Sequence, residues 1–247
     1  CNIIEGARQL TGAEQFVADL SGRANADSVI LKSRVHPVNA ISVDVFVGVQ
    51  LIDTQWIPEN PGHWFDIVTR IPPDMLYSAA TVQLVPHLDD GELYVPARHT
   101  IMTDDTGIVS PPGDVLATYQ DGHLRLIDYQ VDITDTELNL TFDWYSDGHT
   151  TGDYRFFVHL YDDVNQPPPV QWDNYLGNST LPLGNWLEGI RQDTITLNIE
   201  SLDAGEYQLM IGFYDSLTYD RLSPLSEDDR ITAYADGRLA LQSVEIE

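Results

Sequence analysis

The residues best suited to bind a ligand lie in one stretch of the second half of the chain, QPPPVQWDNYLGNSTLPLGNW (166–186). Its candidate residues combine flat apolar rings with hydrogen-bonding groups: Trp172, Asp173, Asn174, Tyr175 and Trp186. Such rings stack well on a sugar ring, and they are equally common anchors in protein interfaces. In a third interpretation, the proline run stiffens a loop whose aromatic side chains only cover the end of a domain. The sequence leaves a glycan, a protein partner and structural cover as open alternatives.

Acidic side chains gather in short segments elsewhere. Asp89, Asp90 and Glu92 bring several carboxylate oxygens together on a predicted turn, and oxygen ligands of this kind suit Ca²⁺. Their spacing does not match an EF-hand loop, so solvated acidic turns are the alternative. Calcium at these three residues is the metal cofactor that the sequence leaves open, and no motif establishes it.

The sequence contains no recognisable catalytic constellation. It lacks a G-x-S-x-G elbow, a glycine-rich phosphate loop and an H-E-x-x-H motif. We therefore predict a protein without enzyme activity, and a hydrolase with an unrecognised site is the alternative. The seven histidines include no close pair typical of zinc sites: His36, His63, His87, His99, His123, His149 and His159. We expect His159 to be at least half-buried and hydrogen-bonded to a neighbouring strand or carboxylate.

Charge narrows the range of partners. The formal net charge is −27, from 39 acidic and 12 basic residues. A surface this acidic repels nucleic acids and anionic lipid headgroups, and it attracts cations or a basic protein. Hydrophobic residues make up 43% of the chain, as in a globular protein.

The single cysteine is the first residue, Cys1, so no intramolecular disulfide can form. The start Cys1–Asn2 resembles the mature end of bacterial lipoproteins, in which the cysteine sulfur carries a diacylglycerol. This resemblance implies a covalent diacylglycerol on Cys1 and a lipid anchor in the membrane. It also implies a position on the extracytoplasmic face of the bacterial cytoplasmic membrane, or at the cell surface. The alternative is a cut chain that begins at a cysteine by chance.

The next residues have helical spacing. Thr11 and Glu14 match a capping box, and apolar residues recur between Leu10 and Leu20 at the period of a helix. Residues 1–24 are therefore predicted to hold the anchor segment and a short amphipathic helix at about 12–20.

From Asn25 onward the apolar residues recur with a period of two, as in half-buried strands. In residues 40–53 six of them are predicted to share one face of a single strand: Ile41, Val43, Val45, Val47, Val49 and Leu51. Asp-Gly pairs predict turns at 90–91, 121–122, 147–148 and 236–237. The polar, Pro/Gly-rich segment 103–114 marks a domain boundary. The sequence thus predicts an all-β protein with two antiparallel, immunoglobulin-like β-sandwiches, 25–106 and 113–247.

Four segments of the second domain follow one another in a familiar order: YRFFVHLYDD, VQWDN, LGNWLEGIRQDTITLNI and LDAGEYQLMIGFYDSLTYDRL. They resemble the β-sandwich module at the C-terminal, extracytoplasmic end of bacterial membrane proteins of the glycosyltransferase type, which is described as carbohydrate-binding-like. The resemblance covers about 137–222. Ala204 replaces the usual proline before Gly205, and Glu188 precedes Gly189 where the pattern has the reverse order. The membrane-spanning catalytic part has no counterpart in this sequence, so the resemblance implies a fold but no enzyme activity.

In this domain Trp144, Tyr207 and Phe213 are predicted to lie in the core, with Tyr207 closing a corner through a hydrogen bond to the backbone. As a whole, the sequence predicts a non-catalytic, lipid-anchored, extracytoplasmic accessory protein that contacts a protein partner in a membrane complex or surface assembly. A surface carbohydrate-binding lipoprotein is one alternative. A filament formed by pairing of edge strands is another.

Overall fold

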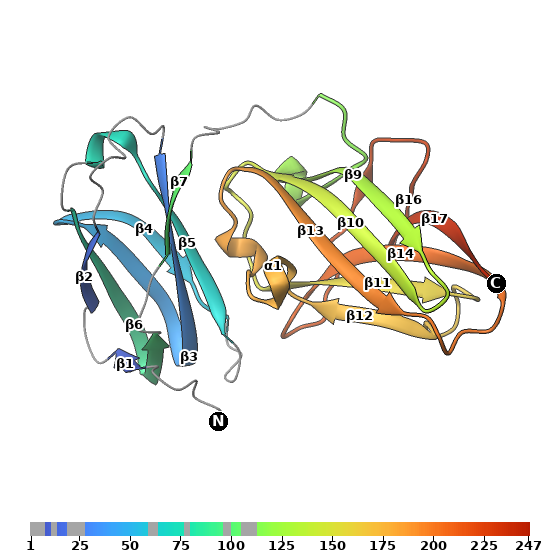
Figure 1. The fold of residues 1–247 in the computed structure, drawn as a ribbon, viewed down its shortest axis with the longest axis horizontal. Helices are drawn as coiled ribbons and strands as arrows, with labels where there is room; N and C mark the ends of the chain where they lie inside the picture. The colour runs from blue at the N-terminus through green and yellow to red at the C-terminus, as the bar shows by residue number, and fades with distance from the viewer. Residues whose placement is uncertain are drawn as a thin grey trace. The chain divides into compact units, whose positions relative to one another are not determined.

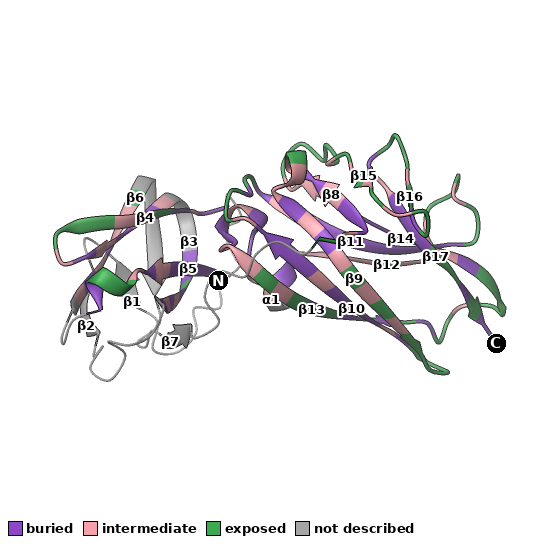
Figure 2. Ribbon diagram, turned by 90° about the horizontal axis from the view of Figure 1, so that it is seen from above, coloured by how far each residue is buried: buried purple, intermediate pink, exposed green. Residues whose placement is uncertain are grey.

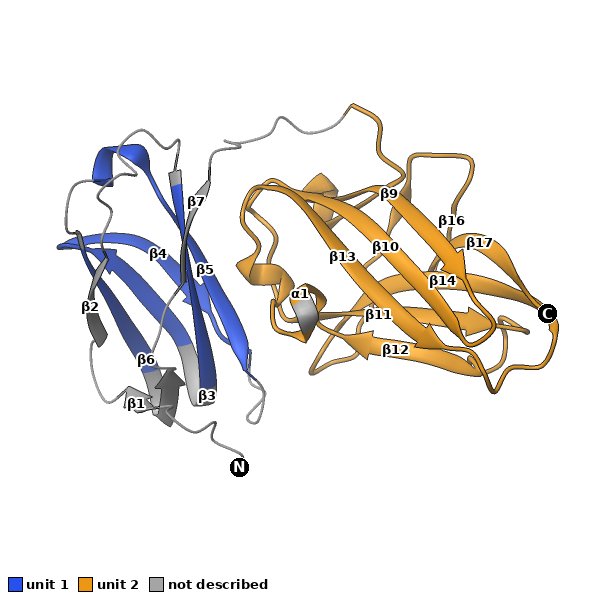
Figure 3. Cartoon of the chain, in the orientation of Figure 1, with its two compact units in different colours: residues 1–109 blue, residues 110–247 orange. Residues whose placement is uncertain are grey.

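The computed structural model describes residues 8–10, 14–18, 28–58, 64–76, 80–95, 100–104 and 113–247. It is mostly β-strand, at 59%, and its paired strands run antiparallel, which confirms the predicted all-β class. The only α-helix among the described residues is the short α1 (Leu176–Ser179). No helix in the described part has the length and apolar character needed to cross a membrane. The chain divides into two compact units, Cys1–Val109 and Ser110–Glu247 (Figure 3).

Unit 1 is built around one long strand, β3 (Ser28–Val47). The first part of β3 pairs with β5 and β7, and the second part pairs with β4 and β6 (Figure 1). Val43, Val45 and Val47 are buried, so the period of two correctly identifies the inner face. The other strands of this unit are β1 (Arg8–Leu10), β2 (Glu14–Ala18), β4 (Gln50–Trp56), β5 (Phe65–Ile71), β6 (Ala80–Val95) and β7 (Thr100–Asp104); a 3₁₀ turn, η1, spans Pro73–Met75.

One predicted strand and one predicted turn of unit 1 are wrong. The strand predicted over 40–53 is a hairpin, because Gly48 takes a positive φ of 62° and reverses the chain. As a result Val49 is fully exposed instead of facing the core. At Asp90–Gly91 the chain does not turn: β6 continues, and its pairing with β3 shifts from Glu92–Val38 to Leu88–Ala40. The extra residues are taken up as an irregularity within the strand.

The predicted N-terminal helix is also wrong. Glu14–Ala18 forms β2 and pairs with β6, with Glu14 opposite Leu84. Pairing with a sheet overrides the local helical spacing, since Phe16 and Val17 also suit a strand. Cys1 lies outside the described residues. Asp89, Asp90 and Glu92 lie within β6 and not on a loop, and their side chains lie outside the described ones.

Unit 2 consists of two five-stranded antiparallel sheets, β13-β10-β9-β8-β15 and β12-β11-β14-β17-β16. Their bounds are β8 (Ala117–Tyr119), β9 (Leu124–Ile133), β10 (Glu137–Ser146), β11 (Tyr154–Tyr161), β12 (Val170–Asn174), β13 (Gly189–Asn198), β14 (Gly205–Asp215), β15 (Leu225–Ser226), β16 (Thr232–Ala233) and β17 (Leu239–Ile246). Two 3₁₀ turns, η2 (Gln120–Gly122) and η3 (Leu183–Asn185), complete the unit. Figure 2 shows buried and more exposed residues alternating along several of these strands.

Aromatic rings join the two sheets. The ring of Trp144 on β10 lies 5.5 Å from those of Phe156 on β11 and Phe213 on β14, measured between centroids. Trp144, Phe213 and Tyr207 are buried, as predicted. The hydroxyl of Tyr207 donates to the carbonyl oxygen of Asp203 at 2.9 Å, which confirms the predicted corner. Whether this packing is immunoglobulin-like stays a prediction.

The Asp-Gly turns predicted in the second half are confirmed. Gly122, Gly148 and Gly237 lie between strands and have φ values of 92°, 80° and 83°. Each occupies the left-handed region that glycine adopts without a steric penalty.

Candidate functional site

One face of the β12-β11-β14 sheet carries a cleft of about 390 Å³, which we call the outer cleft. Residues alternate across each strand, so Phe156 faces the core while Phe157 and His159 lie on the cleft side. Strands β11, β12 and β14 and the loop after β14 supply its lining: Phe157, His159, Gln171, Asp173, Tyr214, Tyr219 and Arg221.

The floor of the cleft is the ring of Phe157, which is fully buried. Phe157 pairs with Gly212 on β14, and a Cβ at Gly212 would lie 2.5 Å from the Cζ atom of Phe157. The guanidinium of Arg221 lies 5.0 Å from the centroid of the Phe157 ring. The absence of a side chain at Gly212 therefore leaves room for the Phe157 ring beneath Arg221.

One side of the cleft is a short hydrogen-bonded chain of polar groups. His159 Nε2 lies 3.2 Å from Asp173 Oδ2, and His159 Nδ1 lies 3.1 Å from the hydroxyl of Tyr161. Both contacts are satisfied when Nε2–H donates to the carboxylate and Nδ1 accepts from the tyrosine. His159 is 7% exposed, so its predicted burial and carboxylate partner are confirmed. The arrangement fixes the carboxylate of Asp173 at the edge of the cleft, where 26% of its side chain stays exposed.

The other side of the cleft is formed by two tyrosine rings. Tyr214 and Tyr219 stack with 6.0 Å between centroids and an angle of 14° between planes. Tyr219 is 73% exposed, so one face of its ring is open to solvent. Burial, followed by the charge of Asp173, raises the pKa of Tyr214, so that its hydroxyl stays protonated at neutral pH.

The loop that carries Tyr219 is tightly held. The Asp215 carboxylate accepts the backbone N–H groups of Leu217 and Thr218, both at 2.9 Å. Ser216 forms two hydrogen bonds with Asp153. Its backbone N–H donates to the Asp153 carbonyl oxygen at 2.9 Å, and its hydroxyl donates to the Asp153 carboxylate. Tyr219 has a φ of 64°, a left-handed conformation that costs a non-glycine residue free energy. Backbone strain of this kind concentrates at functional sites.

Asp153 gives a pH-dependent prediction. Burial raises its pKa above 3.8 and outweighs the hydrogen bond from Ser216, which lowers it. The folded state therefore binds this proton more tightly than the unfolded state. At neutral pH the buried charge destabilises the fold, and this penalty disappears as the pH falls through the folded pKa.

We expect the stability of the wild type relative to Asp153→Asn to rise between pH 7 and pH 4. Urea unfolding of both proteins across this pH range measures the difference. Asparagine is chosen because its side-chain oxygen can still accept the hydrogen bond from the Ser216 hydroxyl. A difference that stays constant, or falls with acidification, would contradict this role of Asp153.

Of the five ligand-binding residues predicted from the sequence, Asp173 alone lines the outer cleft. Trp172 is on the opposite face of β12, and its ring centroid lies 6.4 Å from that of Phe156. The half-buried Asn174 accepts the N–H of Tyr175 through its side-chain oxygen at 2.9 Å. These three residues belong to β12 and not to the predicted loop, because the segment after the proline run pairs with β11.

The remaining two predicted ligand-binding residues, Tyr175 and Trp186, are buried within unit 2. Tyr175 is 1% exposed and Trp186 is 4% exposed. The guanidinium of Arg155 lies 5.4 Å from the Tyr175 ring centroid, and that of Arg191 lies 4.6 Å from the Trp186 ring centroid. Burial, followed by the charge of Asp153, raises the pKa of Tyr175 to about 12. In the described structure neither ring offers a free face to a ligand.

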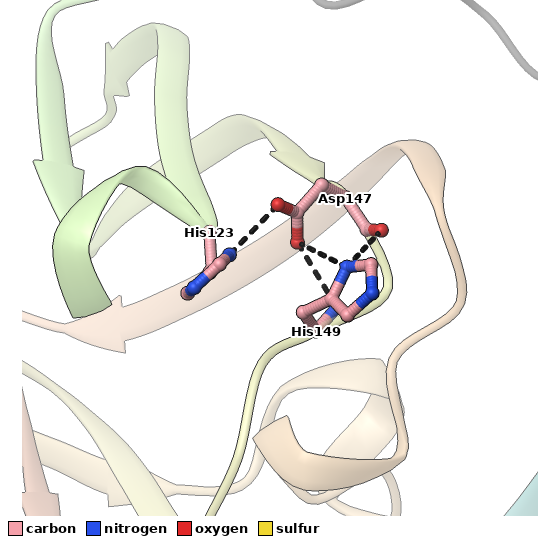
Figure 4. Close-up of side chains that lie close together, drawn as sticks. All are labelled: His123, Asp147 and His149. Carbon is pink, nitrogen blue, oxygen red and sulfur yellow. Dashed lines mark hydrogen bonds and ion pairs between the residues drawn. The ribbon is translucent and has the colours of Figure 1, made fainter.

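Sequence reasoning missed Tyr214, Tyr219 and Arg221. The first follows from alternation, since Tyr214 must face away from the core if Phe213 faces into it. No spacing rule identifies the other two, because a loop conformation brings them to the cleft. Sequence reasoning also missed the proximity of His123 and His149, which both contact Asp147 (Figure 4).

A second hollow, of about 490 Å³, lies beside β8 and β15. Thr118, Arg125 and Glu227 contribute to its lining, but its one aromatic ring, Tyr119, is 1% exposed. A platform for stacking is therefore lacking there, although this hollow is larger than the outer cleft.

Comparison with known proteins assigns no family. No family model and no curated protein matches the chain. The solved structures that it resembles include a β-glucuronidase of Bacteroides uniformis (7% identity, TM-score 0.29) and a glycosyl hydrolase family 2 member of Bacteroides cellulosilyticus (11%, 0.27). These alignments cover 87% and 94% of this chain but only 26% and 28% of the other proteins. A β-glucuronidase of Ruminococcus gnavus is similar at 11% identity and TM-score 0.24, over 95% of this chain and 35% of that protein.

The chain thus spans about a quarter to a third of the length of these structures. Resemblance at this level assigns neither an activity nor a fold family, so the functional argument rests on the outer cleft.

Proposed function

We propose that the protein is a non-catalytic carbohydrate-binding protein and that the outer cleft of unit 2 is its binding site. The observation that carries this proposal is the stacked pair Tyr214–Tyr219 beside a carboxylate that His159 holds in place. A sugar ring presents an apolar face of C–H groups and a rim of hydroxyls. The exposed ring of Tyr219 would stack on that face, and Asp173, Gln171 and the Tyr214 hydroxyl would bond the rim.

Charge indicates the class of sugar. The net charge of −27 disfavours uronic acids and sulfated sugars as ligands. We therefore propose an uncharged oligosaccharide.

A protein partner is the second candidate, because Leu217 in the Tyr219 loop is 58% exposed and exposed apolar side chains mark interfaces. The lipid anchor at Cys1, the extracytoplasmic location and the role as a subunit of a membrane or surface assembly stay predictions from the sequence.

Asp173→Asn tests the proposal. The change keeps the shape of the side chain but removes a charged acceptor, and hydrogen bonds to charged groups contribute about 1.5–3 kcal/mol. We expect affinity for an uncharged oligosaccharide, chosen on a glycan array and measured by calorimetry, to fall at least about tenfold. Asp143→Asn on β10 of the other sheet is the matched control, since it makes the same charge change outside the cleft.

Equal affinity of the wild type and Asp173→Asn would exclude the cleft as the binding site. Absence of binding to every array glycan, combined with a stoichiometric protein partner that Leu217→Ala releases, would favour the second candidate instead.

A further inference from the structure

A separate cluster of side chains lies at one end of the other sheet of unit 2, where β9 begins and β10 ends. Leu124 pairs with Ser146 in the β9–β10 ladder. One position further along, the N–H of Asp147 donates to the carbonyl oxygen of His123 at 3.1 Å. The ladder thus fixes the backbone of both residues, although they are 24 positions apart in the sequence.

The side chains of His123 and His149 approach Asp147 from two sides (Figure 4). His123 Nδ1 lies 2.8 Å from Asp147 Oδ2, and His149 Nδ1 lies 3.4 Å from Asp147 Oδ1. One nitrogen of each imidazole and one carboxylate oxygen all lie within 4.8 Å of one another. Among the described residues this is the single cluster of histidine and acidic side chains with three ligand atoms so close together.

The turn that presents His149 is held from both ends. Gly148 has a φ of 80°, and the N–H of His149 donates to Asp147 Oδ1 at 3.0 Å. Two residues later, the Gln120 amide accepts the N–H of Thr151 at 2.9 Å and donates to its carbonyl oxygen at 2.8 Å. The backbone is therefore fixed before any ligand arrives. The His149 side chain is 77% exposed, and its Nδ1 also lies 3.0 Å from the carbonyl oxygen of Asp147.

We propose that His123, Asp147 and His149 bind a first-row transition-metal ion such as Zn²⁺, with a fourth position left to water. Two imidazoles and a carboxylate are a common ligand set for Zn²⁺, whose bonds of about 2.0–2.2 Å require ligand atoms within roughly 4 Å of each other. A rotation of the exposed His149 ring, which would break its contact with the Asp147 carbonyl oxygen, would bring the third ligand within that range. Nitrogen ligands do not suit Ca²⁺ or Mg²⁺. The acidic surface as a whole, with its net charge of −27, raises the local concentration of cations.

Calorimetric titration of the whole protein with zinc chloride tests the site. We expect one Zn²⁺ ion per chain. We expect His123→Ala and His149→Ala each to lower the affinity for Zn²⁺ at least about tenfold, because removing a group that only orients a metal ligand already lowers metal affinity 10–100-fold. His87→Ala is the matched control. His87 forms a similar pair with Asp44, at 2.7 Å, but belongs to no three-ligand cluster among the described residues.

Histidine ring NMR supplies a second readout that does not depend on affinity. The ring nitrogen signals of His123 and His149 should shift on addition of one equivalent of Zn²⁺, and those of His87 should not. His149→Ala changes an exposed side chain, so its circular dichroism spectrum should match the wild type. Unchanged zinc binding in both histidine variants, or loss of binding in His87→Ala, would overturn the proposal.

Discussion

Replacing Trp144 by alanine is expected to lower the free energy of unfolding of unit 2 by about 3–5 kcal/mol. The indole is fully buried between the two sheets, with the rings of Phe156 and Phe213 on the opposite sheet 5.5 Å away. Alanine would leave a cavity at the point where the sheets meet. Urea unfolding followed by circular dichroism measures the loss, and only the transition of unit 2 should move if the two units unfold separately.

Trp144→Phe is the matched control for this change. Phenylalanine keeps an aromatic ring between the sheets and removes the indole N–H, which has no hydrogen-bond partner among the described residues. Because burying an unpaired donor costs free energy, its removal offsets part of the lost packing, and we expect a much smaller loss than with alanine. Equal unfolding midpoints for Trp144→Ala and the wild type would contradict the shared aromatic core.

Replacing Tyr219 by glycine is expected to weaken carbohydrate binding strongly while leaving the fold intact. Loss of the exposed ring removes the stacking surface, and a fall in affinity of at least about tenfold follows if stacking contributes roughly 1.5 kcal/mol. Glycine adopts the φ of 64° without strain, which stabilises the fold, but it also makes the unfolded chain more flexible. These effects oppose each other, so the stability should change by less than about 1 kcal/mol.

Leu217→Ala provides the control in the same loop. Leu217 is 58% exposed and does not line the cleft, so this variant should bind carbohydrate as the wild type does. Calorimetry and urea unfolding on both variants separate the two effects. Wild-type affinity in Tyr219→Gly would show that stacking on this ring plays no part in binding.

Local sequence patterns are sufficient to predict most of unit 2. The alternation around Phe156 and Phe213 identifies the core face, and Tyr207 and the Asp-Gly pairs identify a corner and three turns. These features depend on the preferences of single residues and on the period of a strand. The same alternation also assigns Phe157, His159 and Tyr214 to the opposite face.

The errors in unit 1 arise where pairing with distant strands decides the structure. Val49 continues an apolar alternation through a hairpin, so the pattern hides the turn at Gly48. Asp90–Gly91 has the composition of a turn, but Leu88 and Glu92 on either side of it both pair with β3, and the segment stays within β6. Glu14–Ala18 has helical spacing, yet it adds to the same strand. Neighbours supplied by the rest of the fold override local preference in all three cases.

The candidate site could be predicted only in part. Asp173 and His159 follow from the sequence, but the emphasis on Trp172 and Trp186 does not match the cleft, since an aromatic residue beside prolines can equally serve as cover. Tyr219 reaches the cleft through the conformation of a loop, and His123 meets His149 through the β9–β10 ladder. Residue spacing in the sequence predicts neither the position of Tyr219 in the cleft nor the contact between His123 and His149.

The most direct test of the central claim is an NMR titration of the whole protein, labelled on its tyrosine rings, with an uncharged oligosaccharide that binds it on a glycan array. The outer cleft predicts saturable shifts in the ring signals of Tyr214 and Tyr219, which the variants Tyr214→Phe and Tyr219→Phe assign. It also predicts no shift for the buried Tyr119 on the far sheet. Saturable glycan binding that leaves the signals of Tyr214 and Tyr219 unmoved would contradict the claim, as would the absence of any bound glycan on the array.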